Sequence, residues 1–224
     1  EWVWCKGWYG DPHEWSSLLA NHGYAVLLPN IRGSQGYGVE FIEMNNEDLG
    51  GADFDDIMSG IDYLIEQGIA DPERLGISGW SYGGFMTARA VTRTTRFKAA
   101  VDGAGSVNFG SQYRSTDNDI MWDYYFQGNP YNKKEAYDRG SPISHVTKVK
   151  TPVLILHGKE DKRVPVSQGI EFYRALKKLG VTTKCVLYPR AGHGIREQAH
   201  QIDLMNRVLD WFNTYLKPHM RGGA

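Results

Sequence analysis

The sequence predicts an α/β protein with a mostly parallel sheet that is covered by helices on both faces. Short apolar runs alternate with stretches whose apolar residues recur at helical spacing, as strands and helices do in such a fold. Of the 224 residues, 41% are hydrophobic and 23% are charged, which is typical of a globular protein. Because no repeat, low-complexity tract or linker interrupts the pattern, we expect one domain over residues 1–224.

The expected elements follow one another in a regular order. Strands are expected at residues 24–30, 74–79, 97–105, 151–158 and 184–189, where apolar runs end at Gly, Pro or Asn. Helices are expected at residues 53–65, 85–93, 166–179 and 197–216. The last helix is expected to place Ile202, Met205, Val208, Leu209 and Phe212 on its apolar side.

Residues 106–150 are less regular and form an insertion between two expected core strands. An insertion of this length either covers a site or packs as additional helices. Its aromatic residues are therefore either walls of a substrate pocket or simple packing, and the pattern leaves both interpretations open. The aromatic residues concerned are Tyr113, Trp122, Tyr124, Tyr125 and Phe126.

The motif Gly-Trp-Ser-Tyr-Gly-Gly at residues 79–84 carries the first candidate catalytic residue. Ser81 lies directly after an expected strand and before an expected helix, the position of a nucleophile elbow in an α/β-hydrolase fold. We expect Gly79 and Gly83 to be glycines because side chains there would clash with the neighbouring strand and helix. The backbone N–H of Tyr82 would then face a developing oxyanion.

A serine hydroxyl needs a base, and in this fold the acid and the histidine follow the serine along the chain. Asp161 follows the expected strand 151–158, and His193 follows the strand 184–189 in a glycine-flanked loop. Asp161 has an alternative role as a helix cap, and Glu160 is an alternative acid. His157 precedes the glycine at a strand end and is expected to be packed and hydrogen-bonded. The other histidines are His13, His22, His145, His200 and His219.

These motifs, with Pro-Asn-Ile-Arg-Gly-Ser-Gln-Gly-Tyr-Gly at residues 29–38, resemble the hydrolase domain of the prolyl oligopeptidase family. The resemblance covers about residues 15–216 and is greatest to the acylaminoacyl-peptidase and dipeptidyl-peptidase branches. It implies that Ser81 is the nucleophile, His193 the general acid-base and Asp161 the residue that orients His193. It also implies that Arg163 binds a substrate carbonyl or carboxylate; an ion pair with Glu160 or Asp161 is the alternative. Trp80, Tyr113, Trp122 and Tyr125 complete the candidate substrate-binding residues.

The chain departs from the family pattern at its beginning. Relatives carry a β-propeller before the hydrolase domain, and none is expected here. We also expect no counterpart of the first two strands of the fold, and therefore an N-terminally shortened fold with an open sheet edge. The aromatic N-terminal residues or a second subunit in a homodimer would cover that edge.

The second oxyanion donor is the other point of departure. Acylaminoacyl-peptidases have a His-Gly-Gly-Pro turn where this chain has Tyr9, Gly10, Asp11 and Pro12. Dipeptidyl peptidases instead use the hydroxyl of a tyrosine at the position of Tyr9. The donor is therefore either the Tyr9 hydroxyl, which we favour, or the Asp11 amide.

The expected function is a serine hydrolase that forms an acyl-enzyme on short-chain esters, small peptides or aminoacyl amides. A catalytically silent binding domain with an incomplete oxyanion hole is the alternative. A dienelactone-hydrolase-like enzyme would need a cysteine nucleophile, and neither Cys5 nor Cys185 lies at an elbow.

Composition and motifs limit the kinds of partner and cofactor that we expect for the chain. The net charge of −1 gives no reason to expect nucleic acid or an anionic membrane as a partner. No signal peptide or membrane segment is evident, and two thiols are expected to be free in a cytoplasmic protein. No metal or other cofactor is expected, because the sequence has no metal-ligand cluster or phosphate-binding loop.

Overall fold

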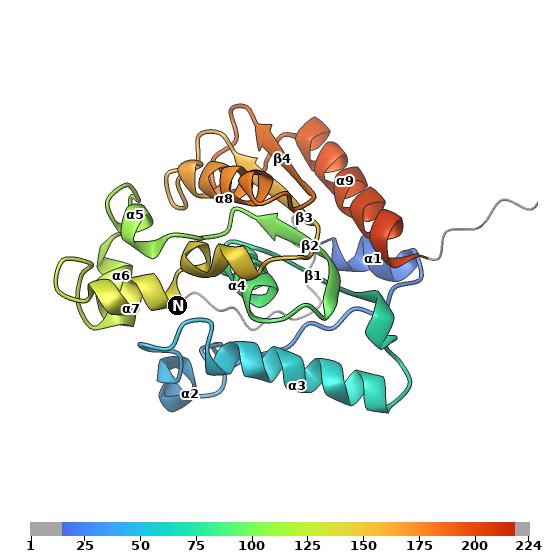
Figure 1. Ribbon diagram of the computed structural model, residues 1–224, viewed down its shortest axis with the longest axis horizontal. Helices are drawn as coiled ribbons and strands as arrows, with labels where there is room; N and C mark the ends of the chain where they lie inside the picture. The colour runs from blue at the N-terminus through green and yellow to red at the C-terminus, as the bar shows by residue number, and fades with distance from the viewer. Residues whose placement is uncertain (1–14, 218–224) are drawn as a thin grey trace, which may run out of the picture.

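The computed structural model describes residues 15–217, in which four parallel strands form a sheet of order β1-β2-β3-β4 (Figure 1). The strands are β1 (Leu75–Trp80), β2 (Phe97–Gly103), β3 (Val153–Gly158) and β4 (Thr183–Tyr188). The α-helices outside residues 106–150 are α1 (Ser16–Asn21), α2 (Val39–Glu43), α3 (Ala52–Glu66), α4 (Tyr82–Arg93), α8 (Ser167–Lys178) and α9 (Gln198–Leu216). This is the α/β-hydrolase arrangement that the sequence predicted.

Alternate residues of each strand point to opposite faces of the sheet. On one face, Val101 of β2 and Leu156 of β3 pack against α9, with Val208 and Phe212 buried in the same cluster. On the other face, Ile155 of β3 packs against α4 and α8. All six residues of β3 are buried, because this inner strand has helices on both sides. A parallel sheet covered in this way explains why its strands read as continuous apolar runs.

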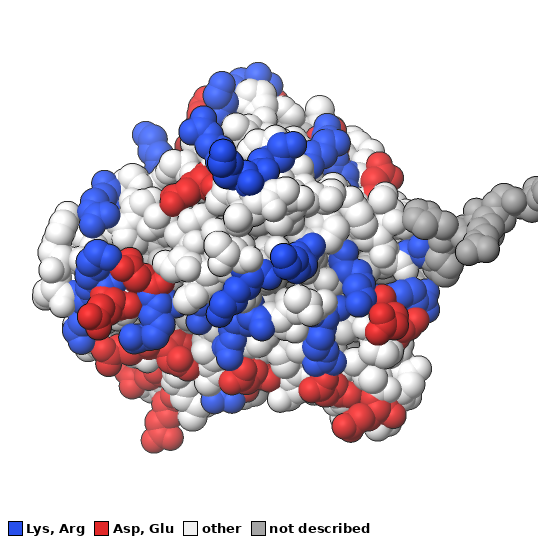
Figure 2. Space-filling view, in the orientation of Figure 1, with Lys and Arg blue, Asp and Glu red and all other residues white. Residues whose placement is uncertain are grey.

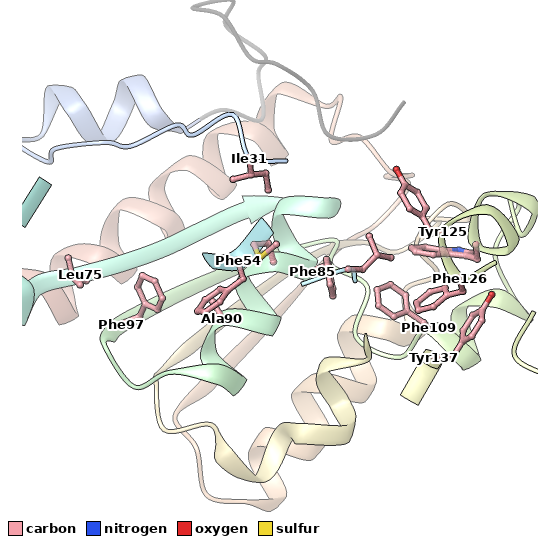
Figure 3. Close-up of a cluster of buried hydrophobic side chains, with 13 residues drawn as sticks. Ile31, Phe54, Leu75, Phe85, Ala90, Phe97, Phe109, Tyr125, Phe126 and Tyr137 are labelled. Atoms are coloured by element: carbon pink, nitrogen blue, oxygen red, sulfur yellow. The ribbon is translucent and has the colours of Figure 1, made fainter. Parts of the chain in front are cut away.

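The insertion at residues 106–150 folds into short helices that pack on the end of α4 (Figure 3). Phe85 of α4 lies 5.0 Å from Phe109, centroid to centroid, and Phe109 contacts Phe126 at 5.2 Å. The rings of Phe126 and Tyr137 stack at 4.0 Å. The elements of the insertion are α5 (Phe109–Tyr113), α6 (Ile120–Phe126), α7 (Lys134–Gly140) and the 3₁₀ helix η2 (Pro142–Lys148). A second 3₁₀ helix, η1 (Pro72–Arg74), leads into β1.

The strand expected at residues 24–30 was wrong. These residues are extended but form no strand, and Leu28 is 55% exposed. A strand needs a backbone partner, and within residues 15–217 this segment forms no ladder with the sheet. Leu27 instead rests on α3, where a Cβ added to Gly60 would lie 3.0 Å from the Leu27 side chain.

The expected apolar side of the last helix was wrong at one position. Ile202 is 55% exposed, whereas Leu204, Val208, Phe212 and Leu216 are buried. The buried residues repeat every four positions, so the stripe that faces the sheet begins at Leu204. Ile202 lies outside this stripe.

Basic and acidic side chains are both present on the surface of the described residues (Figure 2). Figure 2 shows Lys and Arg mixed with Asp and Glu on one face, with the acidic side chains denser toward α2 and α3. Between residues 15 and 217, no helix is long and apolar enough to cross a membrane.

Candidate active site

Ser81 occupies the turn that joins β1 to α4. Its φ of +59° and ψ of −113° lie in a region that residues other than glycine rarely adopt, so the turn is strained. The Ser81 N–H donates to the carbonyl of Gly103 on β2 at 2.8 Å, which ties the turn to the sheet. Strain of this kind is what lifts a nucleophile above the carboxyl edge of a sheet.

The glycines around the turn are required by close backbone approaches, though not at both expected positions. A Cβ on Gly79 would lie 2.6 Å from the backbone of Gly83, so Gly79 has no room for a side chain. The clash expected at Gly83 was wrong, because a Cβ there would meet nothing within 4 Å. The crowded helical position is Gly84, whose added Cβ would lie 2.3 Å from the carbonyl oxygen of Gly103.

Three side chains from distant segments form one hydrogen-bonded chain at this edge. Ser81 Oγ lies 2.9 Å from His193 Nε2, and His193 Nδ1 lies 2.8 Å from Asp161 Oδ2. A carboxylate can only accept, so Nδ1 carries the hydrogen and donates, which leaves Nε2 free to accept from Ser81. This is the tautomer that a general base needs.

Asp161 is held as an ionised acceptor. It is 5% exposed, and its Oδ1 accepts the backbone N–H groups of Arg163 and Val164, each at 3.0 Å. Burial raises the pKa of Asp161, but its interactions with the neighbouring imidazoles of His157 and His193 outweigh burial and lower it to about 2. The helix-cap alternative was wrong, because α8 begins at Ser167 after Val166 and the two backbone bonds of Asp161 lie within the preceding turn.

The loops that carry the acid and the base are bonded to each other. The Glu160 N–H donates to the Ala191 carbonyl at 2.8 Å, and Lys159 N–H donates to the Tyr188 carbonyl at 2.8 Å. A Cβ on Gly158 would lie 2.0 Å from the carbonyl of Gly192, so this approach requires glycine. The two loops therefore form one rigid support for His193 and Asp161.

Trp80 contacts the loop that bears the base. Its indole Nε1 donates to the backbone carbonyl of His193 at 2.8 Å, and the ring packs with the cluster on the α9 side of the sheet. This bond gives Trp80 a supporting contact with the loop of His193, and its contact with substrate stays a prediction. Sequence reasoning placed Trp80 beside Ser81 but had no signal for this long-range bond.

Tyr82 is the first residue of α4, where a backbone N–H has no partner within the helix. Its phenol donates to Asp53 of α3, and Asn45 Nδ2 lies 3.5 Å from the same hydroxyl. Burial, and then the charge of Asp53, raise the pKa of Tyr82 well above its ordinary value. The side chain therefore anchors the residue whose N–H is the predicted oxyanion donor, and sequence reasoning missed both Asp53 and Asn45. Tyr9 and Asp11 lie outside the described residues.

The aromatic residues of the insertion are mainly packing. Trp122 and Tyr125 are only 5% and 6% exposed and belong to the cluster around Phe109, which favours the packing interpretation over the pocket-wall interpretation. Both lie on α6, which buries one face against α4 and α5, and large aromatic rings supply most of that buried area. Tyr113 is half-buried, and its hydroxyl donates to Asp123 at 3.4 Å.

Arg163 follows Asp161 in the same loop. Its Nε donates to Asp117 Oδ1 at 2.7 Å, so the ion pair expected with Glu160 or Asp161 was wrong in its partner. Both side chains are about one-third or more exposed, at 34% and 44%, and such a pair contributes little to stability. The contact joins the acid loop to the insertion.

The remaining candidates do not join the hydrogen-bonded chain. Glu160 is exposed, and His157 is fully buried on β3 with Nε2 2.8 Å from the Val164 carbonyl. His200 lies in α9, 3.9 Å from Glu197. Among residues 15–217, no group of three or more His, Cys, Asp or Glu side chains could hold a metal ion.

The fold and this geometry define the class: a serine hydrolase of the α/β-hydrolase type. The chain belongs to the prolyl oligopeptidase family, whose sequence model matches residues 13–219.

Relatives agree with this assignment. The uncharacterized peptidase YuxL of Bacillus subtilis (strain 168) is 40% identical over 209 residues, which are 91% of this chain and 32% of the relative. The acylamino-acid-releasing enzyme of Arabidopsis thaliana is 34% identical over 93% of this chain and 30% of its own length. Uncomplexed acylaminoacyl peptidase of Pyrococcus horikoshii superposes with a TM-score of 0.78 at 34% identity, over 87% of this chain and 33% of that one. The chain thus spans about a third of the length of these proteins.

Proposed function

We propose that this chain hydrolyses peptide and acyl–amino acid bonds through an acyl-enzyme on Ser81. The observation that carries the proposal is the continuous chain from Ser81 Oγ to His193 Nε2 at 2.9 Å and from His193 Nδ1 to Asp161 at 2.8 Å. Distances in this range allow proton transfer without rearrangement of either side chain. Family membership supports the same chemistry.

In the first half-reaction, Ser81 Oγ attacks the substrate carbonyl carbon while His193 Nε2 takes the hydroxyl proton. The carbonyl oxygen becomes an oxyanion and accepts a hydrogen bond from the Tyr82 backbone N–H. His193 then gives its proton to the leaving amine, and the acyl group stays on Ser81. Asp161 remains ionised throughout and stabilises the imidazolium.

In the second half-reaction, water takes the place of the amine. His193 removes a proton from the water, the hydroxide attacks the acyl carbon, and Ser81 leaves with the proton that His193 returns. A second donor completes the oxyanion hole, and we assign it to the Tyr9 hydroxyl with the Asp11 amide as the alternative. Loss of such a donor costs about 2.7–4 kcal/mol in the barrier, so Tyr9→Phe distinguishes the two.

The substrate class rests on two arguments. Several relatives bear the names acylamino-acid-releasing enzyme and dipeptidyl-peptidase 5, which supports short peptides and blocked amino acids as substrates. Short-chain esters extend the proposal, because their leaving groups need less protonation than an amine. We expect ester hydrolysis to be faster than amide hydrolysis at the same acyl group.

The test compares the wild type with Ser81→Ala on p-nitrophenyl esters of increasing chain length and on acetylaminoacyl p-nitroanilides. We expect turnover by the wild type and a loss of about 10³-fold or more in Ser81→Ala. A fluorophosphonate probe should label the wild type and leave the variant unlabelled. Folded wild-type protein that neither turns over a substrate nor takes the label would overturn the proposal and favour a silent binding domain.

A further inference from the structure

We propose that His157 is a positioning residue for the reaction, because it fixes the loop that aims Asp161 at His193. The inference rests on the proposed function, in which Asp161 orients the base. His157 touches neither Ser81 nor His193 in any hydrogen bond that we observe among residues 15–217. Its effect on catalysis would therefore pass through Asp161.

One ring nitrogen of His157, Nε2, bonds to the loop that follows β3. His157 is fully buried at the end of β3, and its Nε2 lies 2.8 Å from the carbonyl oxygen of Val164. A carbonyl oxygen can only accept, so Nε2 carries a hydrogen and donates it. The bond spans seven residues and closes the loop from the end of β3 to Val164.

His157 is linked to Asp161 through the backbone of Val164. The same Val164 donates its backbone N–H to Asp161 Oδ1 at 3.0 Å, so His157 and Asp161 bind the two polar groups of one residue. His157 Nε2 also lies 3.5 Å from Asp161 Oδ2, the oxygen that accepts from His193. This second distance is too long for a good hydrogen bond, so the main hold on the acid passes through Val164. With the Nε2 donor removed, Val164 loses one of its two anchors, which loosens one of the two backbone bonds that hold the Asp161 carboxylate toward His193.

For the other ring nitrogen of His157, Nδ1, we infer a partner on the adjacent strand. Within the described part of the chain, His157 Nδ1 and Asp102 Oδ2 are both buried without a hydrogen-bond partner. Asp102 lies on the adjacent strand β2 opposite Ile155, which puts it on the same face of the sheet as His157. One bridging water would satisfy both, because it can accept from a protonated Asp102 Oδ2 and donate to His157 Nδ1. Asp102 would thus fix the orientation of the imidazole from behind.

The surroundings leave room for this pair and add no competing charge. A Cβ on Gly169 of α8 would lie 2.8 Å from His157 Nδ1, so glycine there keeps the nitrogen accessible. Burial raises the pKa of Asp102 to about 7, against the attraction of His157. Burial, and then the charge of Asp102, raise the pKa of the Cys185 thiol on β4 to about 11, so the thiol stays neutral. The titratable groups that surround His157 are therefore Asp102, Asp161 and Cys185.

Two conservative variants separate the two ring nitrogens. The amide nitrogen of glutamine reaches about as far as Nε2, whereas that of asparagine reaches only as far as Nδ1. We expect His157→Gln to keep kcat within about threefold of the wild type and His157→Asn to lose about 10- to 100-fold, both with little change in KM. Both variants put an amide of nearly the same polarity into the same buried place, so a role in stability alone predicts a difference in the free energy of unfolding but no such split in kcat of the folded protein.

A double-mutant cycle and a spectroscopic signal complete the test. If His157 acts through Asp161, His157→Asn adds little to the loss caused by Asp161→Asn, whereas independent effects would multiply. In Ser81→Ala protein, the hydrogen on His193 Nδ1 should give a low-field NMR resonance that survives in His157→Gln and disappears in His157→Asn. This signal does not depend on turnover, so it decides the proposal even where the proposed function fails. Equal kcat and retained resonances in both variants would overturn it.

Discussion

Replacing Asp161 with asparagine tests whether the tautomer of His193 decides activity. In the wild type, Asp161 Oδ1 accepts two backbone N–H groups while Oδ2 accepts from His193 Nδ1. An asparagine has one acceptor oxygen, and the two backbone donors require it at the Oδ1 position. Its NH₂ group then faces His193 Nδ1, which can no longer donate.

The imidazole must respond by moving its hydrogen. Nδ1 becomes the acceptor, Nε2 carries the hydrogen, and that hydrogen points at Ser81 Oγ instead of taking its proton. Loss of the correct tautomer lowers kcat by about 10⁴-fold in a serine protease with the same three residue types, which corresponds to about 5 kcal/mol in the barrier. We expect a loss of this order in Asp161→Asn with little change in KM.

The assay is steady-state hydrolysis of the best substrate found for the wild type, with circular dichroism to check the fold. Glu160→Gln is the matched control, because it makes the same chemical change at an adjacent exposed residue whose backbone N–H bonds to Ala191 of the base loop. We expect its rate to stay within about twofold of the wild type. An Asp161→Asn variant that keeps more than about a tenth of the wild-type rate would refute the reasoning, and a large loss in Glu160→Gln would move the acid to that residue.

Three further changes have definite expected outcomes. Because burial holds the pKa of Asp102 at about 7, above its ordinary value of 3.8, the stability tied to its protonated form is complete below about pH 4 and is lost as pH rises to about 7. Asp102→Asn should therefore gain about 3 kcal/mol on the wild type between about pH 5 and about pH 8 in urea unfolding, and parallel curves would contradict this. Gly84→Ala should destabilise the fold by about 1–3 kcal/mol or more, because the new methyl group clashes with a β2 carbonyl. Gly83→Ala is the matched control and should leave the melting temperature unchanged or raise it, so equal effects of the two variants would contradict the crowding at Gly84. Trp80→Phe should cost about 1 kcal/mol of stability and lower kcat several-fold, because it removes the donor to the His193 carbonyl, and unchanged kinetics would show that this bond does not position the base.

Local patterns were sufficient to predict the elements that bear the reactive groups. The run at residues 151–158 has four consecutive aliphatic residues because β3 is buried on both faces, and the structure has a strand there at Val153–Gly158. The serine turn was predictable because its requirements lie within six neighbouring residues. Residues 24–30 look equally apolar, yet a strand also needs a backbone partner, and periodicity carries no information about one.

Contacts between distant segments were not predictable in the same way. The charges near Arg163 in the sequence suggested Glu160 or Asp161 as partners, whereas the fold brings Asp117 from the insertion to within 2.7 Å. Trp122 and Tyr125 could equally have faced a pocket, because an aromatic ring has the same sequence signature in a wall and in a core. Only the packing of α6 against Phe109 decides between the two.

The support behind the reactive groups depends on strand register. The sequence indicated that His157 would be packed and hydrogen-bonded, as the structure has it, but it gave no reason to connect this residue with Asp102. That connection arises because Asp102 pairs with Ile155, so that side chains two residues apart along β3 share a face with it. A shift of one residue in the β2–β3 register would turn Asp102 to the α9 side of the sheet and remove the carboxylate that we propose as the partner of His157 Nδ1. The register of two inner strands therefore decides whether the acid of the site has a second polar layer behind it.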